Sequence, residues 1–133
     1  MRRAGSFTLV AESTDELGKK QRSAKPLNAA EHNGRETAGF IVAEAHPRAA
    51  GHIITIDVVP DVRRHGVGSL LLGVAEERLR SGGCLAVELE TAVDNVSALS
   101  FYKRHGYHVV RTFPHYYANG VDALVLEKAL ARC

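Results

Sequence analysis

The chain has 133 residues, of which 45% are hydrophobic and 24% charged, and its formal net charge is +2. This length suits a single domain with one core, spanning residues 1–133. The small net charge argues against a nucleic-acid partner, the apolar runs are too short to cross a membrane, and two cysteines without metal or disulfide spacing indicate a cytoplasmic protein.

The first half of the chain is predicted to form three strands and one helix. Residues 7–12 read as a short strand, and the polar stretch at residues 13–36 is expected to be a long, mobile loop because proline and glycine interrupt it. Two apolar strands follow at residues 37–46 and 52–59, joined by a hairpin turn. Apolar side chains at helical spacing predict a helix over residues 66–80, which ends at a pair of glycines.

The second half alternates strands and helices. Residues 85–91 alternate apolar and acidic side chains, which predicts a strand. A second helix is expected over residues 95–105, followed by strands at residues 107–113 and 121–129. This order implies a mixed sheet with helices packed on it.

The turn between residues 59 and 69 has the composition of an anion site. Gly66 and Gly68 let a ligand approach the backbone at the start of a helix, whose N-terminus attracts negative charge. Arg63, Arg64 and His65 add positive charge beside it. The alternative is a basic turn in which the glycines serve geometry alone.

Two common phosphate loops do not match this turn. A P-loop requires a Lys that is missing here, and a dinucleotide fingerprint requires a small residue where Leu71 stands. The remaining pattern, Arg63-x-x-Gly66-x-Gly68, resembles the loop that holds the pyrophosphate of acyl-coenzyme A in the GNAT acetyltransferase superfamily.

A second motif strengthens the resemblance. Asn95, Ala98 and Tyr102 share one face of the predicted helix, as in the Asn-x-x-Ala-x-x-x-Tyr motif of GNAT enzymes. The resemblance covers residues 7–130 and implies an α/β (α+β) fold, with a mixed, mostly antiparallel sheet and flanking helices. The family's usual N-terminal strand and two helices are not matched. The sheet surface that they would cover is expected to be exposed, which favours a homodimer.

The resemblance also implies acetyl-CoA as the acyl donor, without a metal. The carbonyl oxygen of the thioester is expected to meet a backbone N–H group near the end of the strand at residues 52–59, where the family has a bulge. The implied donor-binding residues are Val58, Val59, Arg63, Arg64, His65, Gly66, Val67, Gly68, Ser69, Asn95, Ala98 and Tyr102.

The acceptor site is implied by residues 114–128, which resemble the Tyr-Tyr and Asp-Ala segment of protein N-terminal acetyltransferases. Tyr116 and Tyr117 would shape a peptide slot, or would only pack across a hairpin. The other histidines, among them His52, are interpreted as surface residues, with His65 a neighbour of the phosphate.

Two residues are predicted to be catalytic. The resemblance makes Glu90 the general base, with Glu88 on the same strand face as a rival, and makes Tyr102 the acid that protonates the leaving sulfur. The plainer alternatives are that Glu90 and Glu88 are solvated carboxylates at a strand edge and that Tyr102 only packs in the core. An α-amine has a pKa of about 7.7–8, against about 10.4 for Lys, so a modest base suffices for it.

Three functions remain open at this point. The favoured one is transfer of an acetyl group from acetyl-CoA to a primary amine, foremost the N-terminal α-amine of a protein or peptide. The second is acetylation of a small amine. The third is an acyl-CoA-binding module with little catalysis.

Overall fold

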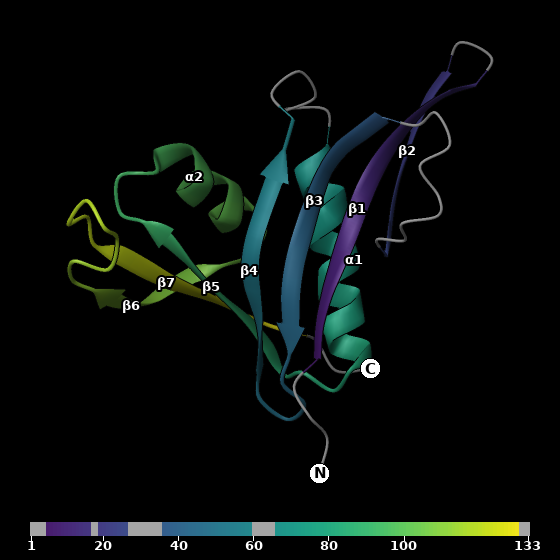
Figure 1. Cartoon of the computed structure of the whole chain (residues 1–133). Coiled ribbons are helices and arrows are strands. Elements are labelled where there is room, and N and C mark those ends of the chain that lie inside the picture. Colours follow the sequence, from purple (N-terminus) through teal and green to yellow (C-terminus); the bar gives the residue numbers. More distant parts are fainter. Residues whose placement is uncertain (1–4, 17–18, 27–35, 60–65, 131–133) are drawn as a thin grey trace.

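The computed structural model describes residues 5–16, 19–26, 36–59 and 66–130. These residues form one sheet of seven strands, in the order β2-β1-β3-β4-β5-β7-β6, and two helices (Figure 1). Only the β4–β5 pairing is parallel. The predicted mixed, mostly antiparallel sheet with flanking helices is confirmed. The elements are β1 (Gly5–Glu16), β2 (Lys19–Pro26), β3 (Glu36–Ala45), β4 (Ala50–Val58), α1 (Val67–Ser81), β5 (Ala86–Ala92), α2 (Val96–Arg104), β6 (His108–Phe113) and β7 (Ala123–Ala129).

The loop predicted at residues 13–36 is wrong over its first part. β1 continues to Glu16, and β2 pairs with it antiparallel from Glu16↔Lys19 to Leu9↔Pro26. β2 is an edge strand that is held by backbone hydrogen bonds, and edge strands are typically rich in Lys and polar residues. Its polar sequence therefore gave no strand signal. Residues 27–35 lie outside the described part of the chain.

Both helices pack on the same face of the sheet, which we call the helix face. The crossovers β4–α1–β5 and β5–α2–β6 move in the same direction across the sheet, so right-handed connections place both helices on one side. Alternate strand residues such as Leu9, Ile41 and Leu89 point into this core. The residues between them point to the other side, which we call the opposite face.

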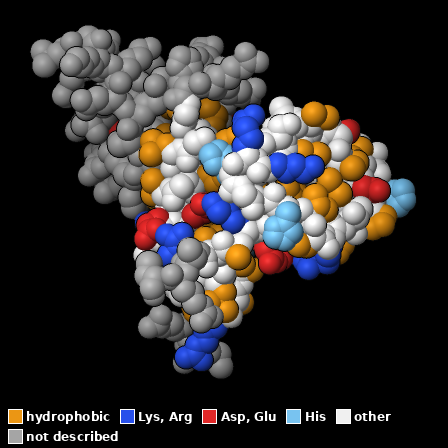
Figure 2. All heavy atoms as spheres, turned by 180° about the vertical axis from the view of Figure 1, so that it is seen from behind, with side chains coloured by type: hydrophobic (Ala, Val, Ile, Leu, Met, Phe, Trp, Pro, Cys, Tyr) orange, Lys and Arg blue, Asp and Glu red, His pale blue; other side chains and the backbone are white. Residues whose placement is uncertain are grey.

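The far edge of the sheet is formed by β6, whose six residues are all exposed. Seen from behind, the described part of the surface mixes hydrophobic side chains with basic, acidic and histidine ones (Figure 2). The larger exposed apolar side chains of β6 and the segment after it are Val109, Val110, Phe113 and Tyr116. The edge is interrupted by a bulge between Val109 and Arg111, which distorts the strand as a template for pairing.

The feature that positions the site is the separation of β4 from β5. Among the described residues, β5 pairs with β4 only where residues 50–52 meet residues 86–88, and the two strands then diverge (Figure 1). Along its other edge, β4 pairs with β3 from Glu44↔His52 to Gly39↔Val58. In that ladder Val42 lies opposite Thr55 and Ala43 opposite Ile53, so Ile54 is the extra residue of a β-bulge. Bulges bend strands, and this one lies where β4 leaves β5.

Candidate active site

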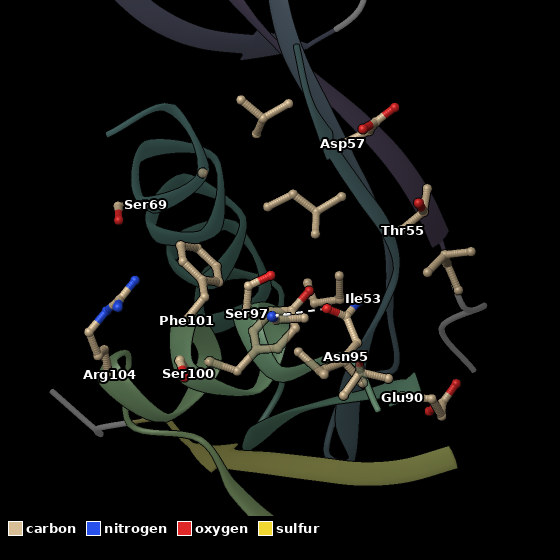
Figure 3. A pocket seen from close by; sticks show the side chains of 18 of the residues that line it. Ile53, Thr55, Asp57, Ser69, Glu90, Asn95, Ser97, Ser100, Phe101 and Arg104 are labelled. Carbon is tan, nitrogen blue, oxygen red and sulfur yellow. Dashed lines mark hydrogen bonds between the residues drawn. The ribbon is translucent and has the colours of Figure 1, made fainter. Parts of the chain in front are cut away.

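A cavity of about 1060 Å³, which we call the slit, fills the space between the diverging strands. It is lined by β4 from Ile53 to Val58, by the end of β5, by the first turn of α1 and by α2 (Figure 3). Of the predicted site residues, it brings together Val58, Gly66, Gly68, Ser69, Glu90, Asn95, Ala98 and Tyr102.

The slit passes through the sheet from one face to the other. Phe101 and Tyr102 of α2 line it on the helix face, together with Ile53 of β4. Asp57 and Glu90 line it from the opposite face, because they alternate with core-facing neighbours along their strands. Figure 3 shows Asp57 and Glu90 on the side of β4 away from Phe101. Two molecules can therefore approach one another through the sheet from opposite sides.

The first turn of α1 forms one end of the slit. Gly66 precedes the helix with φ 80°, a left-handed conformation that glycine adopts without strain. The first intrahelical bond runs from the Leu70 N–H to the Gly66 carbonyl, so the three preceding N–H groups have no partner within the helix. Such a turn is suited to an anion. Val67 was also predicted here, but its side chain is buried in the core, which leaves only its backbone for a ligand.

The basic residues predicted beside this turn, Arg63, Arg64 and His65, lie outside the described residues. Within the described part, Arg104 and Ser100 of α2 line the slit. Ser69 also lines it, and its hydroxyl lies 2.9 Å from Nε2 of His105.

The backbone of β4 corrects one predicted role. The Val59 N–H donates to the Ala38 carbonyl at 2.8 Å, so this N–H belongs to the β3 ladder and cannot meet a thioester. Since N–H groups alternate between the two edges of a strand, those of Ile56 and Val58 are directed toward the slit. The bulge, expected near Val58 and Val59, lies at Ile54 instead.

Glu90 lies at the mouth of the slit on the opposite face, and His52 of β4 holds it. The Nε2 atom of His52 is 2.9 Å from Oε1 and 2.8 Å from Oε2 of Glu90. Both side chains are shielded, with 33% of His52 and 17% of Glu90 exposed. His52, which was interpreted as a surface residue, is partly exposed but also pairs with Glu90 at the slit. The sequence shows that His52 lies between Gly51 and Ile53 in a predicted strand. It does not show that these neighbours are buried or that Glu90 is its partner.

The rival carboxylate, Glu88, has a different environment. Its Oε1 atom accepts a hydrogen bond from Arg111 at 2.9 Å, and it is absent from the residues that line the slit. The geometry therefore favours Glu90 over Glu88 as a base for chemistry in the slit.

Tyr102 is buried against the core but also lines the slit. Its ring meets Phe101 edge-on at 5.3 Å and Tyr107 at 5.8 Å. Burial, with a smaller contribution from Tyr117, raises the pKa of Tyr102 to about 12. The phenol is therefore protonated at neutral pH, as an ordinary tyrosine is, and the raised pKa makes it a weaker acid than a solvent-exposed tyrosine. The packing role and the position in the slit coexist.

Tyr116 and Tyr117 pack edge-to-face at 5.1 Å, and Tyr116 stacks on Phe113 at 6.0 Å. Neither lines the slit. Burial raises the pKa of Tyr117, and the neighbouring Tyr116 and Glu90 raise it further. Tyr116 and Tyr117 therefore show the aromatic packing that was the alternative to a peptide slot. A role in binding a peptide stays a prediction.

The sequence of residues 5–107 matches the profile of the acetyltransferase (GNAT) family. The chain belongs to the GNAT family. It is 35% identical over 81 residues to an N-alpha-acetyltransferase of Sulfurisphaera tokodaii, covering 60% of this chain and 48% of that protein. It is 37% identical over 98 residues to human N-alpha-acetyltransferase 30, covering 71% of this chain and 27% of that protein. The chain thus spans about half the length or less of these two relatives.

The fold also matches that of solved GNAT-like structures. The structure of the NatC complex bound to Gag peptide and CoA superposes with a TM-score of 0.69 and 26% identity, covering 81% of this chain and 70% of that chain.

Within this GNAT chain, Asn95 differs from its predicted place inside a helix. It is the N-cap of α2, where its Oδ1 accepts the Ala98 N–H at 3.2 Å (Figure 3). The Oδ1 atom of Asn95 is thus used by the helix itself. Its Nδ2 group is the part of the side chain left for a ligand in the slit, which Asn95 lines.

The described residues contain no group of three or more His, Cys, Asp or Glu side chains that could hold a metal ion. In the same part of the chain, neither helix has the length and hydrophobicity needed to cross a membrane.

Proposed function

We propose that this GNAT chain carries the active site of an N-acetyltransferase that moves an acetyl group from acetyl-CoA to the N-terminal α-amine of a protein or peptide. The observation that carries the proposal is the slit, with Tyr102 on the helix face and the His52–Glu90 pair on the opposite face. The relatives named N-alpha-acetyltransferase support this choice of acceptor, as does the NatC complex solved with a peptide and CoA.

The residues of the slit fit acetyl-CoA as the donor. Beyond residue 52, the slit-side edge of β4 faces open space instead of β5, and the Ile56 N–H is directed there. A pantetheine arm carries amides that can pair with such an edge. The first turn of α1 offers N–H groups for the pyrophosphate, and Gly66, beside which a Cβ atom would meet nothing within 4 Å, leaves room before them. Arg63, Arg64 and His65 would add charge to the same end.

The mechanism needs one base and one acid. Glu90, held through both oxygens by His52, accepts the proton of the attacking amine. The new C–N bond forms as the C–S bond breaks, and Tyr102 donates its phenolic proton to the departing sulfur. An α-amine is already partly neutral near pH 8, which suits a carboxylate base.

The proposal is tested by acetyl transfer from acetyl-CoA to a panel of peptides with free N-termini. Glu90→Gln and Tyr102→Phe are each expected to lower kcat by about 100-fold or more, as for loss of general acid or base catalysis. Glu88→Gln removes a carboxylate from the same strand face outside the slit and serves as the matched control, with kcat expected to stay within about twofold of the unmodified protein.

The outcomes separate the alternatives. Unchanged activity in both Glu90→Gln and Tyr102→Phe would show that these roles are wrong. Turnover of free small amines with inert peptides would favour a small-molecule acetyltransferase. Tight binding of acetyl-CoA in calorimetry without turnover on any amine would indicate a binding module, and no binding at all would contradict the whole proposal.

A further inference from the structure

A largely buried polar cluster, formed by Glu76, Tyr107 and Lys128, lies outside the residues that line the slit. Glu76 of α1 is only 8% exposed. Its Oε2 accepts a 2.7 Å hydrogen bond from the hydroxyl of Tyr107, and its Oε1 accepts one of 2.9 Å from Nζ of Lys128 in β7. The cluster therefore connects α1, the segment after α2 and the strand β7.

Stability alone is a weak reason for such a cluster. Burying the Glu76 carboxylate and partly shielding the Lys128 ammonium costs free energy that their attraction only partly returns, and apolar residues of similar volume often stabilise a core equally well. A buried hydrogen bond with fixed geometry does, however, specify position. The question is which group needs to be positioned here.

Tyr102 of the slit is in direct contact with the cluster. The ring of Tyr107 meets the ring of Tyr102 at 5.8 Å with an interplanar angle of 66°. The Tyr107 N–H also donates to the Tyr102 carbonyl at 3.0 Å. Burial and the bond to Glu76 raise the pKa of Tyr107, so its hydroxyl stays protonated and keeps donating. Tyr107 is thus fixed at its hydroxyl by Glu76, and its ring and backbone both contact Tyr102.

We propose that Tyr107, anchored by Glu76, is a positioning residue that holds the phenol of Tyr102 in the slit for proton donation. The inference rests on the proposed function, in which Tyr102 is the acid. The Tyr102 hydroxyl is at the far end of its ring, so a small tilt displaces it from the departing sulfur. A misplacement of about 1 Å can cost about 100-fold in rate.

A double-mutant cycle tests this link, because it separates an effect transmitted through Tyr102 from a general loss of structure. Tyr107→Phe removes one hydroxyl and keeps the ring. We expect it to lower kcat by about tenfold while KM for acetyl-CoA stays within about twofold. In a Tyr102→Phe background, the same change is expected to have no further effect on kcat. An equal loss in both backgrounds, or no loss in the unmodified background, would overturn the inference.

Cys84→Ala provides the matched control, since Cys84 is a buried core residue that does not line the slit. It is expected to lower the thermal midpoint without changing kcat, and a kcat loss equal to that of Tyr107→Phe would overturn the inference. If Tyr107→Phe does not fold at the assay temperature, Glu76→Gln replaces it in the same cycle, with the same criteria. A protein without turnover contradicts the proposed function and this inference together, whereas an active protein with additive losses overturns this inference alone.

Discussion

Two glycines on α1 have opposite surroundings. A Cβ atom on Gly68 would lie 3.2 Å from Cζ of Phe101, closer than side chains normally pack. A Cβ atom on Gly73 would meet nothing within 4 Å, and that residue is exposed. Since Phe101 lines the slit, the missing side chain at Gly68 determines how closely α1 and α2 approach at the donor end.

Substituting each glycine by alanine should separate these roles. Gly73→Ala is expected to raise the free energy of unfolding by about 0.5–1 kcal/mol, because alanine favours a helix. Gly68→Ala has the same helical advantage but crowds Phe101, and overpacking costs about 1–3 kcal/mol. We therefore expect no net stabilisation from Gly68→Ala and weaker binding of acetyl-CoA.

Urea unfolding and calorimetric titration with acetyl-CoA measure both effects. The explanation fails if Gly68→Ala gains as much stability as Gly73→Ala and binds acetyl-CoA equally well.

For single residues, a local pattern, a turn before a helix, pointed to the glycines. Glu90 was predicted from the family resemblance instead, because the alternating strand offers Glu88 equally. The sequence did not identify His52 as the partner of Glu90. The two residues are 38 positions apart, and they meet only because β4 and β5 pair at residues 50–52 and 86–88. No local pattern contains that pairing.

Among the elements, α2 is preceded by a residue, its N-cap Asn95, that serves the helix and also lies at the slit. Asn95 caps the helix through Oδ1, and the residue also lines the slit. The cap and the predicted ligand role use different atoms of one side chain, so substitution can separate them.

Asn95→Ala removes both the capping oxygen and the predicted ligand group, and the loss of the cap should lower the free energy of unfolding by about 1 kcal/mol. Asn95→Asp keeps a capping oxygen and places a negative charge where the helix N-terminus favours it, so stability should be retained. If the amide group binds the donor, Asn95→Asp should still raise KM for acetyl-CoA. Unfolding curves and steady-state kinetics on both variants decide this, and an unchanged KM in Asn95→Asp would limit Asn95 to capping.

Helices and strands were predicted correctly where apolar residues recur at helical or strand spacing, and a strand was missed where they do not. α1 and β5 have buried residues at regular spacing, and their predicted bounds differ from the observed ones by only a residue or so. β2 is mostly polar, without the alternating apolar residues that predict a strand, and was missed because only its backbone pairing with β1 makes it one. The β-bulge at Ile54 was also misplaced, because register between strands is a tertiary property.

For the whole molecule, the buried tyrosines predict a loss of stability in alkali. The pKa of Tyr102 is raised to about 12 and that of Tyr107 is raised as well, whereas in the unfolded chain both titrate near 10. Above pH 10 the unfolded chain therefore releases phenolic protons that the folded protein retains, which favours unfolding. Below pH 10 both states are protonated and the contribution is constant.

We expect the free energy of unfolding to fall by about 1–3 kcal/mol between pH 9.5 and 11.5 through these two groups. Denaturant unfolding across this range measures it, and the double variant with Tyr102→Phe and Tyr107→Phe should show a shallower decline. Identical slopes in the two proteins would contradict the assignment, since other titrating groups are common to both.

The three residue pairs that join β4 to β5 leave the rest of one β4 edge facing the slit. Under the proposed function, the donor molecule occupies that edge and acts as the missing part of the sheet. A ligand that binds only the folded state adds stability by mass action, about 2.7 kcal/mol at a concentration of 100 times its Kd. The lifetime of the folded enzyme would then follow the acetyl-CoA supply of the cell, so that scarcity of the donor would reduce the amount of catalyst as well as the rate of each molecule.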